Sequence, residues 1–195
     1  MYRDAAMVTP DGMPLVWLSR RRGRPEVSRV YGPDLMLSCC DSFRDRGARH
    51  YFYGGAEGVP EQLASSLTER FPGLEVAGGF SPPYRDLTEA ENREIVARIN
   101  ESRPDFVWVG LGCPKQDFWM AEHRDELEAP VLVGVGAAFD FHSGRKRQAP
   151  SWMQSRGLEW LFRLLSEPRR LAGRYVAGNS RFIALVLAEE LRLRR

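Results

Sequence analysis

Three glycine-bearing segments carry residue types that suit ligand binding, and each follows a short apolar run. They are Tyr53–Gly58, Val109–Gln116 and Gly134–Asp140. Glycine lets backbone N–H groups approach a ligand closely, and a helix N-terminus directly after such a turn favours phosphate. Three turns of this kind at one sheet edge predict a nucleotide-binding crevice. Its candidate ligand-binding residues are Gly54, Gly55, Gly110, Gly112, Lys115, Gln116, Gly136 and Asp140.

The spacing of these glycines argues against one class of nucleotide site. Tyr53–Gly58 does not follow the G-x-G-x-x-G pattern of dinucleotide-binding folds, and no acidic residue closes the second predicted strand to bind a ribose. Strand-to-helix turns are also glycine-rich for steric reasons, so this segment is a weak signal by itself. A nicotinamide-dependent oxidoreductase is therefore the less favoured alternative.

Two charged residues near the N-terminus could take part in a reaction. Asp11 lies in a Pro-Asp-Gly sequence, which is ordinary turn chemistry. Its carboxylate could also serve as a general base that removes a proton from an attacking hydroxyl group. Arg29 could offset the charge of a phosphate. From the residues alone, both interpretations of Asp11 stay open.

The cysteines and histidines predict neither a metal site nor a covalent nucleophile. His142 lies near Asp140, but no second histidine or cysteine stands at ligand spacing. Cys113 lacks a convincing base and is interpreted as a small core residue. Cys39, Cys40 and Cys113 are an odd number with one adjacent pair, which indicates free thiols in a reducing cytosol. No cofactor is expected.

Short apolar runs alternate with longer amphipathic ones through most of the chain. Thr88-Glu-Ala-Glu91 is a capping box at the start of one helix, Pro114 precedes another, and Asp34 is predicted to cap a helix beginning at Leu35. This alternation predicts an α/β fold, with a Rossmann-like, mostly parallel sheet and helices on both faces. The expected strands are residues 49–53, 74–77, 106–110 and 131–135, and the expected helices are residues 13–22, 59–70, 89–102, 115–127, 152–165 and 169–193.

The pattern changes after Asp140, where a Gly/Lys/Arg loop leads into aromatic-rich helical segments. We therefore divide the chain into an α/β core, residues 1–144, and a helical appendage, residues 145–195. The appendage contains 12 Lys/Arg and 4 Asp/Glu, a net charge of +8, whereas the core contains 16 and 22, a net charge of −6. This asymmetry predicts an anionic partner such as phosphate, anionic lipid or nucleic acid, and a solvated basic helical face is the alternative.

No segment has the composition of a secretory signal or the length of a membrane span. Residues 1–10 lack a basic region followed by an apolar one, and the longest apolar run near the C-terminus, residues 182–188, is too short to cross a bilayer. The sequence predicts a protein that is soluble or lies on a membrane surface. Aromatics and arginines around Trp160 fit a membrane or self-association better than base stacking, so no nucleic-acid partner is expected.

Several segments share the order and spacing of motifs found in one protein family. They are residues 9–17, 29–35, 51–55, 104–116, 134–140, 143–144, 149–154 and 157–169. Together they resemble the WecG/TagA/CpsF family of bacterial glycosyltransferases, from about Thr9 to Arg174. The resemblance implies an inverting, metal-independent transfer of a hexose or N-acetylhexosamine from a UDP-sugar to a polyprenyl-diphosphate-linked sugar. It also implies a place at the inner face of the cell membrane, in the synthesis of exopolysaccharide, teichoic acid or common antigen.

The resemblance also implies roles for individual residues. Asp11 matches the family's proposed catalytic base, Arg29 matches an active-site arginine, and Gln116 matches a glutamine of the pocket. The family's C-terminal appendage is implied to close over the donor diphosphate and to touch the membrane. The matching arginines of this chain are Arg163, Arg169 and Arg174.

This chain also departs from the family pattern. Family members carry a further stretch before the position of Asp11, with a polar active-site threonine and part of the first sheet, and Thr9 is not its equivalent. We therefore expect an N-terminally shortened core, which keeps a non-catalytic nucleotide- or membrane-binding fragment as an alternative. Glucose, galactose, N-acetylmannosamine and its uronic acid are all compatible as the transferred sugar, and a homo-oligomer is compatible as well.

Overall fold

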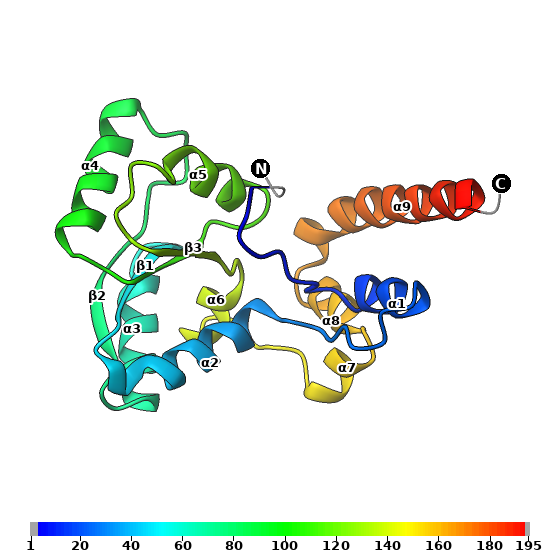
Figure 1. Ribbon diagram of the computed structural model, residues 1–195, viewed down its shortest axis with the longest axis horizontal. Coiled ribbons are helices and arrows are strands. Elements are labelled where there is room, and N and C mark those ends of the chain that lie inside the picture. The colour runs from blue at the N-terminus through cyan, green and yellow to red at the C-terminus, as the bar shows by residue number, and fades with distance from the viewer. Residues whose placement is uncertain (1–3, 194–195) are drawn as a thin grey trace. The chain divides into compact units, whose positions relative to one another are not determined.

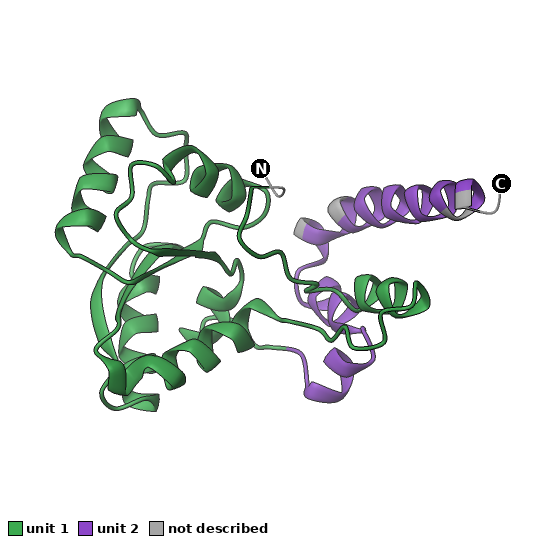
Figure 2. Cartoon of the chain, viewed as in Figure 1, with its two compact units in different colours: residues 1–148 green, residues 149–195 purple. Residues whose placement is uncertain are grey.

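The computed structural model describes residues 4–193, apart from the side chains of residues 170, 174, 190 and 193. The chain divides into two compact units, which are described separately: unit 1 ends at Gln148 and unit 2 begins at Ala149 (Figure 2). The elements in chain order are α1 Met13–Arg21, α2 Gly32–Phe43, the 3-10 helix η1 Arg44–Arg46, β1 Arg49–Gly54, α3 Val59–Arg70, β2 Glu75–Phe80, α4 Glu89–Glu101, β3 Phe106–Gly110, α5 Lys115–His123, β4 Val131–Gly134, α6 Ala138–His142, α7 Ser151–Ser155, α8 Glu159–Ser166 and α9 Pro168–Leu193.

Unit 1 is built on a four-stranded sheet in the order β2-β1-β3-β4, and all three strand pairs are parallel. From β1 the chain moves outward to β2, then crosses back to β3 and moves outward the other way to β4. The strand order therefore reverses between β1 and β3. In open parallel sheets, ligands bind at the carboxyl ends of the two strands that flank this reversal.

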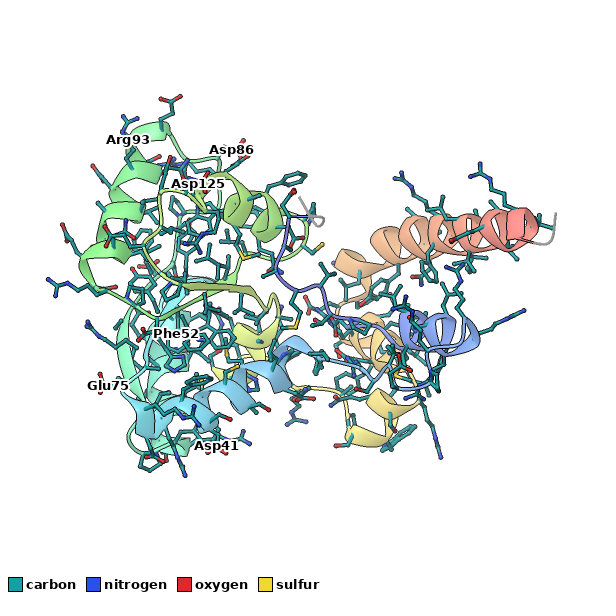
Figure 3. The ribbon with its side chains drawn as sticks, viewed as in Figure 1. Asp41, Phe52, Glu75, Asp86, Arg93 and Asp125 are labelled. Carbon is teal, nitrogen blue, oxygen red and sulfur yellow. The ribbon has the colours of Figure 1, made fainter. Side chains whose placement is uncertain are left out.

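Helices cover both faces of the sheet (Figure 1). Phe52 and Trp108 point to the face covered by α2, α3 and α6, and Phe52 is seen in the interior in Figure 3. Tyr53 and Val109 point to the face covered by α4 and α5. Strands buried on both faces need continuous apolar runs, which explains the composition of β1 and β3. The predicted α/β fold with a Rossmann-like parallel sheet is confirmed.

Of the two caps predicted at helix starts, one is present and one is not. The capping box of α4 is present, because Thr88 Oγ1 accepts from the Glu91 N–H and the Glu91 carboxylate accepts from the Thr88 N–H. The predicted cap by Asp34 is wrong. α2 begins earlier, at Gly32, so Asp34 lies inside its first turn, and the N-cap Tyr31 makes no side-chain cap.

Two predicted helices differ from the observed ones. The helix at 115–127 stops at His123, because the Arg124 guanidinium donates to the carbonyl oxygens of Leu127 and Ala129 at 2.6 and 2.8 Å and stabilises a tight turn. The single helix at 152–165 is instead α7 and α8. Gly157 separates them at a φ of +71°, a left-handed conformation that favours glycine.

Unit 2 consists of α7, α8 and α9. Trp160 of α8 meets Tyr175 of α9 edge-on, with ring centroids 6.4 Å apart, and Leu171 is buried. Trp152, Leu165 and several α9 side chains remain exposed. Among the helices that the structure describes, none is both long and apolar enough to cross a membrane.

Candidate active site

The two predicted catalytic residues, Asp11 and Arg29, lie side by side although 18 positions separate them. The Arg29 Nε donates to the backbone oxygen of Asp11 at 2.5 Å, and Nη2 lies 3.5 Å from the Asp11 carboxylate. The Asp11 side chain is 67% exposed, whereas that of Arg29 is only 17% exposed. Arg29 therefore serves as a semi-buried support that orients an accessible carboxylate.

Backbone contacts join this pair to the carboxyl edge of the sheet. The Val30 N–H donates to the Pro10 oxygen at 3.1 Å, so the segments that carry Asp11 and Arg29 run together. Gly32 then packs against Val135, the residue that follows β4: a Cβ at Gly32 would lie 3.3 Å from the Val135 Cα. The segment that follows Arg29 is thus anchored beside the end of β4, at the edge where parallel sheets bind ligands.

Tyr31 is a supporting residue that the sequence reasoning missed. Its ring is buried, and the Arg29 guanidinium lies over it, 4.0 Å from the ring centroid. A guanidinium held by a ring on one side and by Asp11 on the other loses little further freedom when it binds an anion. The only signal available was the position of Tyr31 within residues 29–35, one of the segments that carry the family resemblance.

The glycines at the ends of β1 and β3 are required by close packing. A Cβ at Gly54, where φ is +123°, would lie 2.6 Å from the Gly110 carbonyl carbon. A Cβ at Gly55 would lie 2.8 Å from the Val59 side chain, and one at Gly110 would lie 2.7 Å from the Phe139 ring. These three glycines thus have a packing reason of their own, and their contact with a ligand remains a prediction. Gly112 has open space around it.

Gln116 connects the start of α5 to the turn after β4. It is buried, and its Oε1 accepts a hydrogen bond from the Gly136 N–H at 3.0 Å. A Cβ at Gly134 would lie 2.7 Å from the Gln116 Nε2, so this amide fills the space beside β4. Gln116 therefore holds two of the glycine-bearing turns together. Its neighbour Lys115 is exposed at the first position of α5.

Asp140 makes an ion pair that the sequence reasoning missed. The Lys146 Nζ lies 2.8 Å from the Asp140 carboxylate, and the Lys146 N–H donates to the Asp140 carbonyl at 2.9 Å. Both side chains are about one-third exposed, at 36% and 28%. Lys146 stands in the basic loop after residue 143, so its charge was visible in the sequence, but its partner was not.

Two side chains near this edge differ from expectation or add to it. Cys113 is exposed, so its interpretation as a core residue is wrong: it stands in the turn between β3 and α5, outside both helix–sheet layers. Cys39, Cys40 and Cys113 form no disulfide. The His142 Nε2 lies 2.9 Å from the Pro33 carbonyl oxygen, and burial lowers the pKa of His142.

The predicted diphosphate-binding arginines belong to unit 2. Arg163 of α8 is half-buried and Arg169 of α9 is exposed. Arg174 also falls in α9, but its side chain lies outside the described residues. The roles of these three arginines stay predictions. Among residues 4–193, as far as their side chains are described, no three His, Cys, Asp or Glu side chains are grouped as a metal site would need.

Comparison with known proteins finds relatives that match most of this chain. The chain is 36% identical over 187 residues to "N-acetylglucosaminyldiphosphoundecaprenol N-acetyl-beta-D-mannosaminyltransferase" of Bacillus spizizenii, which covers 96% of this chain and 70% of that protein. It is 29% identical over 171 residues to the protein of the same name from Staphylococcus aureus strain MW2, which covers 88% of this chain and 65% of that protein. The chain thus spans about two thirds of the length of these relatives.

The match to the family itself covers the whole sequence. Residues 1–195 match the pattern described as "Glycosyl transferase WecG/TagA/CpsF family". The matched range includes Asp11, Arg29 and Gln116. This chain belongs to the WecG/TagA/CpsF family of glycosyl transferases.

Proposed function

We propose that this chain is the catalytic part of an inverting glycosyltransferase that moves a sugar from a UDP-sugar to a polyprenyl-diphosphate-linked acceptor. The observation that carries the proposal is the exposed Asp11 carboxylate, oriented by Arg29 near the carboxyl edge of a parallel sheet. The names of the relatives support N-acetylmannosamine as the transferred sugar and diphosphoundecaprenol-linked N-acetylglucosamine as the acceptor. Such a product belongs to cell-surface polysaccharide synthesis.

In this reaction Asp11 is the general base. Its carboxylate accepts the proton of an acceptor hydroxyl while the hydroxyl oxygen attacks the anomeric carbon of the donor sugar. The bond between that carbon and the UDP oxygen breaks, and UDP leaves with the electron pair. Attack opposite to the leaving group inverts the anomeric centre. A positioned general base contributes about 10²- to 10⁴-fold to such a rate.

The leaving diphosphate gains negative charge, so it needs positive groups or N–H donors close by. In unit 1 we assign this task to Arg29, beside Asp11, and to Lys115, at the first position of α5. Arg163, Arg169 and Arg174 of unit 2 are proposed to close over the diphosphate during turnover. The proposal includes no metal ion, so chelation by EDTA is expected to leave the rate unchanged.

The acceptor lipid would hold the enzyme at a membrane surface. Unit 2 combines an excess of basic residues with exposed apolar side chains, among them Trp152, Leu165 and Ile183. Basic and apolar side chains together favour binding to anionic lipid headgroups. We therefore propose peripheral association with the inner face of the cell membrane. Co-sedimentation with phosphatidylglycerol vesicles that declines with salt would support it, and equal binding to neutral vesicles would contradict it.

The decisive test replaces the base alone. Asp11→Asn keeps the size of the side chain and its oxygen near Arg29 but removes the proton acceptor. Transfer of labelled N-acetylmannosamine from its UDP donor to a short polyprenyl-diphosphate-linked N-acetylglucosamine should fall by about 10²- to 10⁴-fold. Calorimetry should show an unchanged dissociation constant for UDP.

A matched control is Asp86→Asn. Asp86 is also exposed and also precedes a helix, but it lies before α4 (Figure 3). This variant should transfer sugar at the wild-type rate. Wild-type turnover in Asp11→Asn would remove Asp11 as the base, and absence of saturable UDP binding by the unaltered chain would contradict the proposed function. NAD serves as a further control, because the oxidoreductase alternative alone predicts its binding.

A further inference from the structure

A cavity of about 320 Å³ lies among α2, α3 and the end of α6, all within unit 1. The residues of α3 that line the cavity are Ser66, Leu67 and Arg70, in the last turns of that helix. α3 starts beside the Gly55 turn, and a 12-residue helix carries its last residue about 16 Å from its first. The cavity wall that contains Arg70 is therefore remote from the β1 turn of the candidate active site.

The wall of this cavity divides into an apolar and a polar part. Leu37, Leu67 and Phe141 supply the apolar part, and Ser66, Arg70, His142 and Ser143 supply the polar part. None of the lining side chains is acidic, so the polar part offers hydrogen-bond donors and one fixed positive charge. This composition favours a negatively charged ligand over a cation.

The charge of Arg70 is not neutralised by an ion pair with any described carboxylate. Its guanidinium lies over the Phe71 ring, 5.4 Å from the ring centroid. Arginines elsewhere in the unit, such as Arg44 and Arg85, pair with Asp41 and Glu91. Arg70 therefore presents a guanidinium without an ion-pair partner at the cavity wall. A guanidinium can bind an oxyanion through two parallel hydrogen bonds.

His142 adds a group that can change charge. Its Nε2 lies 2.9 Å from the Pro33 oxygen, which can only accept, so Nε2 carries the hydrogen and Nδ1 is the nitrogen that can gain a proton. Burial is the main cause of its lowered pKa, and Arg70 lowers the pKa further, while the Pro33 oxygen and the Asp34 carboxylate of α2 oppose them. An anion beside Arg70 would cancel that repulsion and favour the protonated imidazole.

We propose that this cavity binds a small oxyanion, such as inorganic phosphate or a phosphate group of a nucleotide, with Arg70 as its cationic contact. Ser66 and Ser143 supply hydroxyl donors from two different elements. The Ser143 hydroxyl lies 3.4 Å from the backbone carbonyl oxygen of Asp140, a weak contact that a ligand can replace. Protonation of His142 accompanies binding, so the affinity rises as the pH falls.

Sulfate is the probe that tests this proposal, because its charge stays constant over the pH range in which His142 titrates. Calorimetric or NMR titration of the whole chain should show saturable binding, weakened about tenfold or more in Arg70→Met through loss of a charge-assisted contact. Arg70 is exposed, so this variant should fold normally. Arg93→Met is the matched control, since Arg93 points outward from α4 on the other face of the sheet (Figure 3) and should bind sulfate like the unaltered chain.

The pH dependence tests the part played by His142. Sulfate affinity of the unaltered chain should fall several-fold as the pH rises past the pKa of His142, and His142→Gln should bind with little pH dependence. Displacement of sulfate by phosphate alone assigns the site to a free oxyanion, and displacement by UDP as well assigns it to nucleotide phosphates. Absence of saturable binding, or equal binding by Arg70→Met, overturns the proposal.

Discussion

His50 should make the stability of unit 1 depend on pH. It is fully buried near the start of β1, and its ring stacks on Phe106 with centroids 5.0 Å apart. Its Nδ1 accepts a hydrogen bond from the Trp108 Nε1 at 3.0 Å, so the neutral imidazole carries its hydrogen on Nε2. Nε2 lies buried without a hydrogen-bond partner among the described residues. A second proton would have to displace the Trp108 N–H.

Burial lowers the pKa of His50 from 6.5 to about 4, although the Asp105 carboxylate acts in the opposite direction. The unfolded chain therefore takes up a proton at a higher pH than the folded chain. Well above pH 6.5 the His50 ring is neutral in both the folded and the unfolded chain, so it does not make stability depend on pH. As the pH falls below that value, stability is lost until the folded state also titrates. The full loss is about 3 kcal/mol, of which about 2 kcal/mol falls between about pH 7 and pH 5.

The perturbation is His50→Asn, which removes the titrating ring and keeps an oxygen that can accept from Trp108. The variant should be less stable than the wild type at pH 7, because a buried ring is lost. Between about pH 7 and pH 5, however, the variant should lose about 2 kcal/mol less unfolding free energy than the wild type. Urea unfolding, followed by the NMR signals of β1 and β3, measures this in unit 1. If both proteins lose the same free energy over that interval, the reasoning about His50 is refuted.

Three further predictions concern packing and positioning. Gly110→Ala should destabilise unit 1 by about 1–3 kcal/mol in urea unfolding, because the new methyl group would meet the buried Phe139 ring; unchanged stability would contradict this. Thr88→Ala should cost about 1 kcal/mol through loss of the capping box, and hydrogen exchange in the first turn of α4 should rise. Gln116→Leu should leave the Gly136 N–H unpaired, lower unfolding free energy by about 1–3 kcal/mol and reduce transfer, whereas full activity would show that this contact is dispensable.

Much of unit 1 follows from short-range patterns. Continuous apolar runs predicted β1 and β3 because their side chains are buried on both faces of the sheet. The start of α4 followed from four residues, Thr88 to Glu91, whose groups satisfy one another locally. Such signals depend on neighbours within a few positions, so they can be read without knowledge of the fold.

Other features could not be predicted because they depend on how a turn or loop folds, which the residue types alone do not specify. Arg124 donates to two carbonyl oxygens in the turn after α5, and this helps to end the helix. An arginine in the sequence does not indicate which oxygens its guanidinium will bind. Lys146 was counted as one basic residue of a loop, but its ion pair with Asp140 depends on how that loop folds back. Cys113 was judged by its residue type, whereas its exposure depends on the turn in which it stands.

The candidate site shows the same division. The sequence by itself determined the α/β class, the glycine-bearing turns and, through its motifs, membership in the glycosyltransferase family. It also marked Asp11 and Arg29, but as separate residues with two interpretations for Asp11. Only the tertiary structure decided that Arg29 supports an exposed Asp11 carboxylate and that Gln116 joins two turns, because parallel strands and their crossovers bring distant segments to one edge.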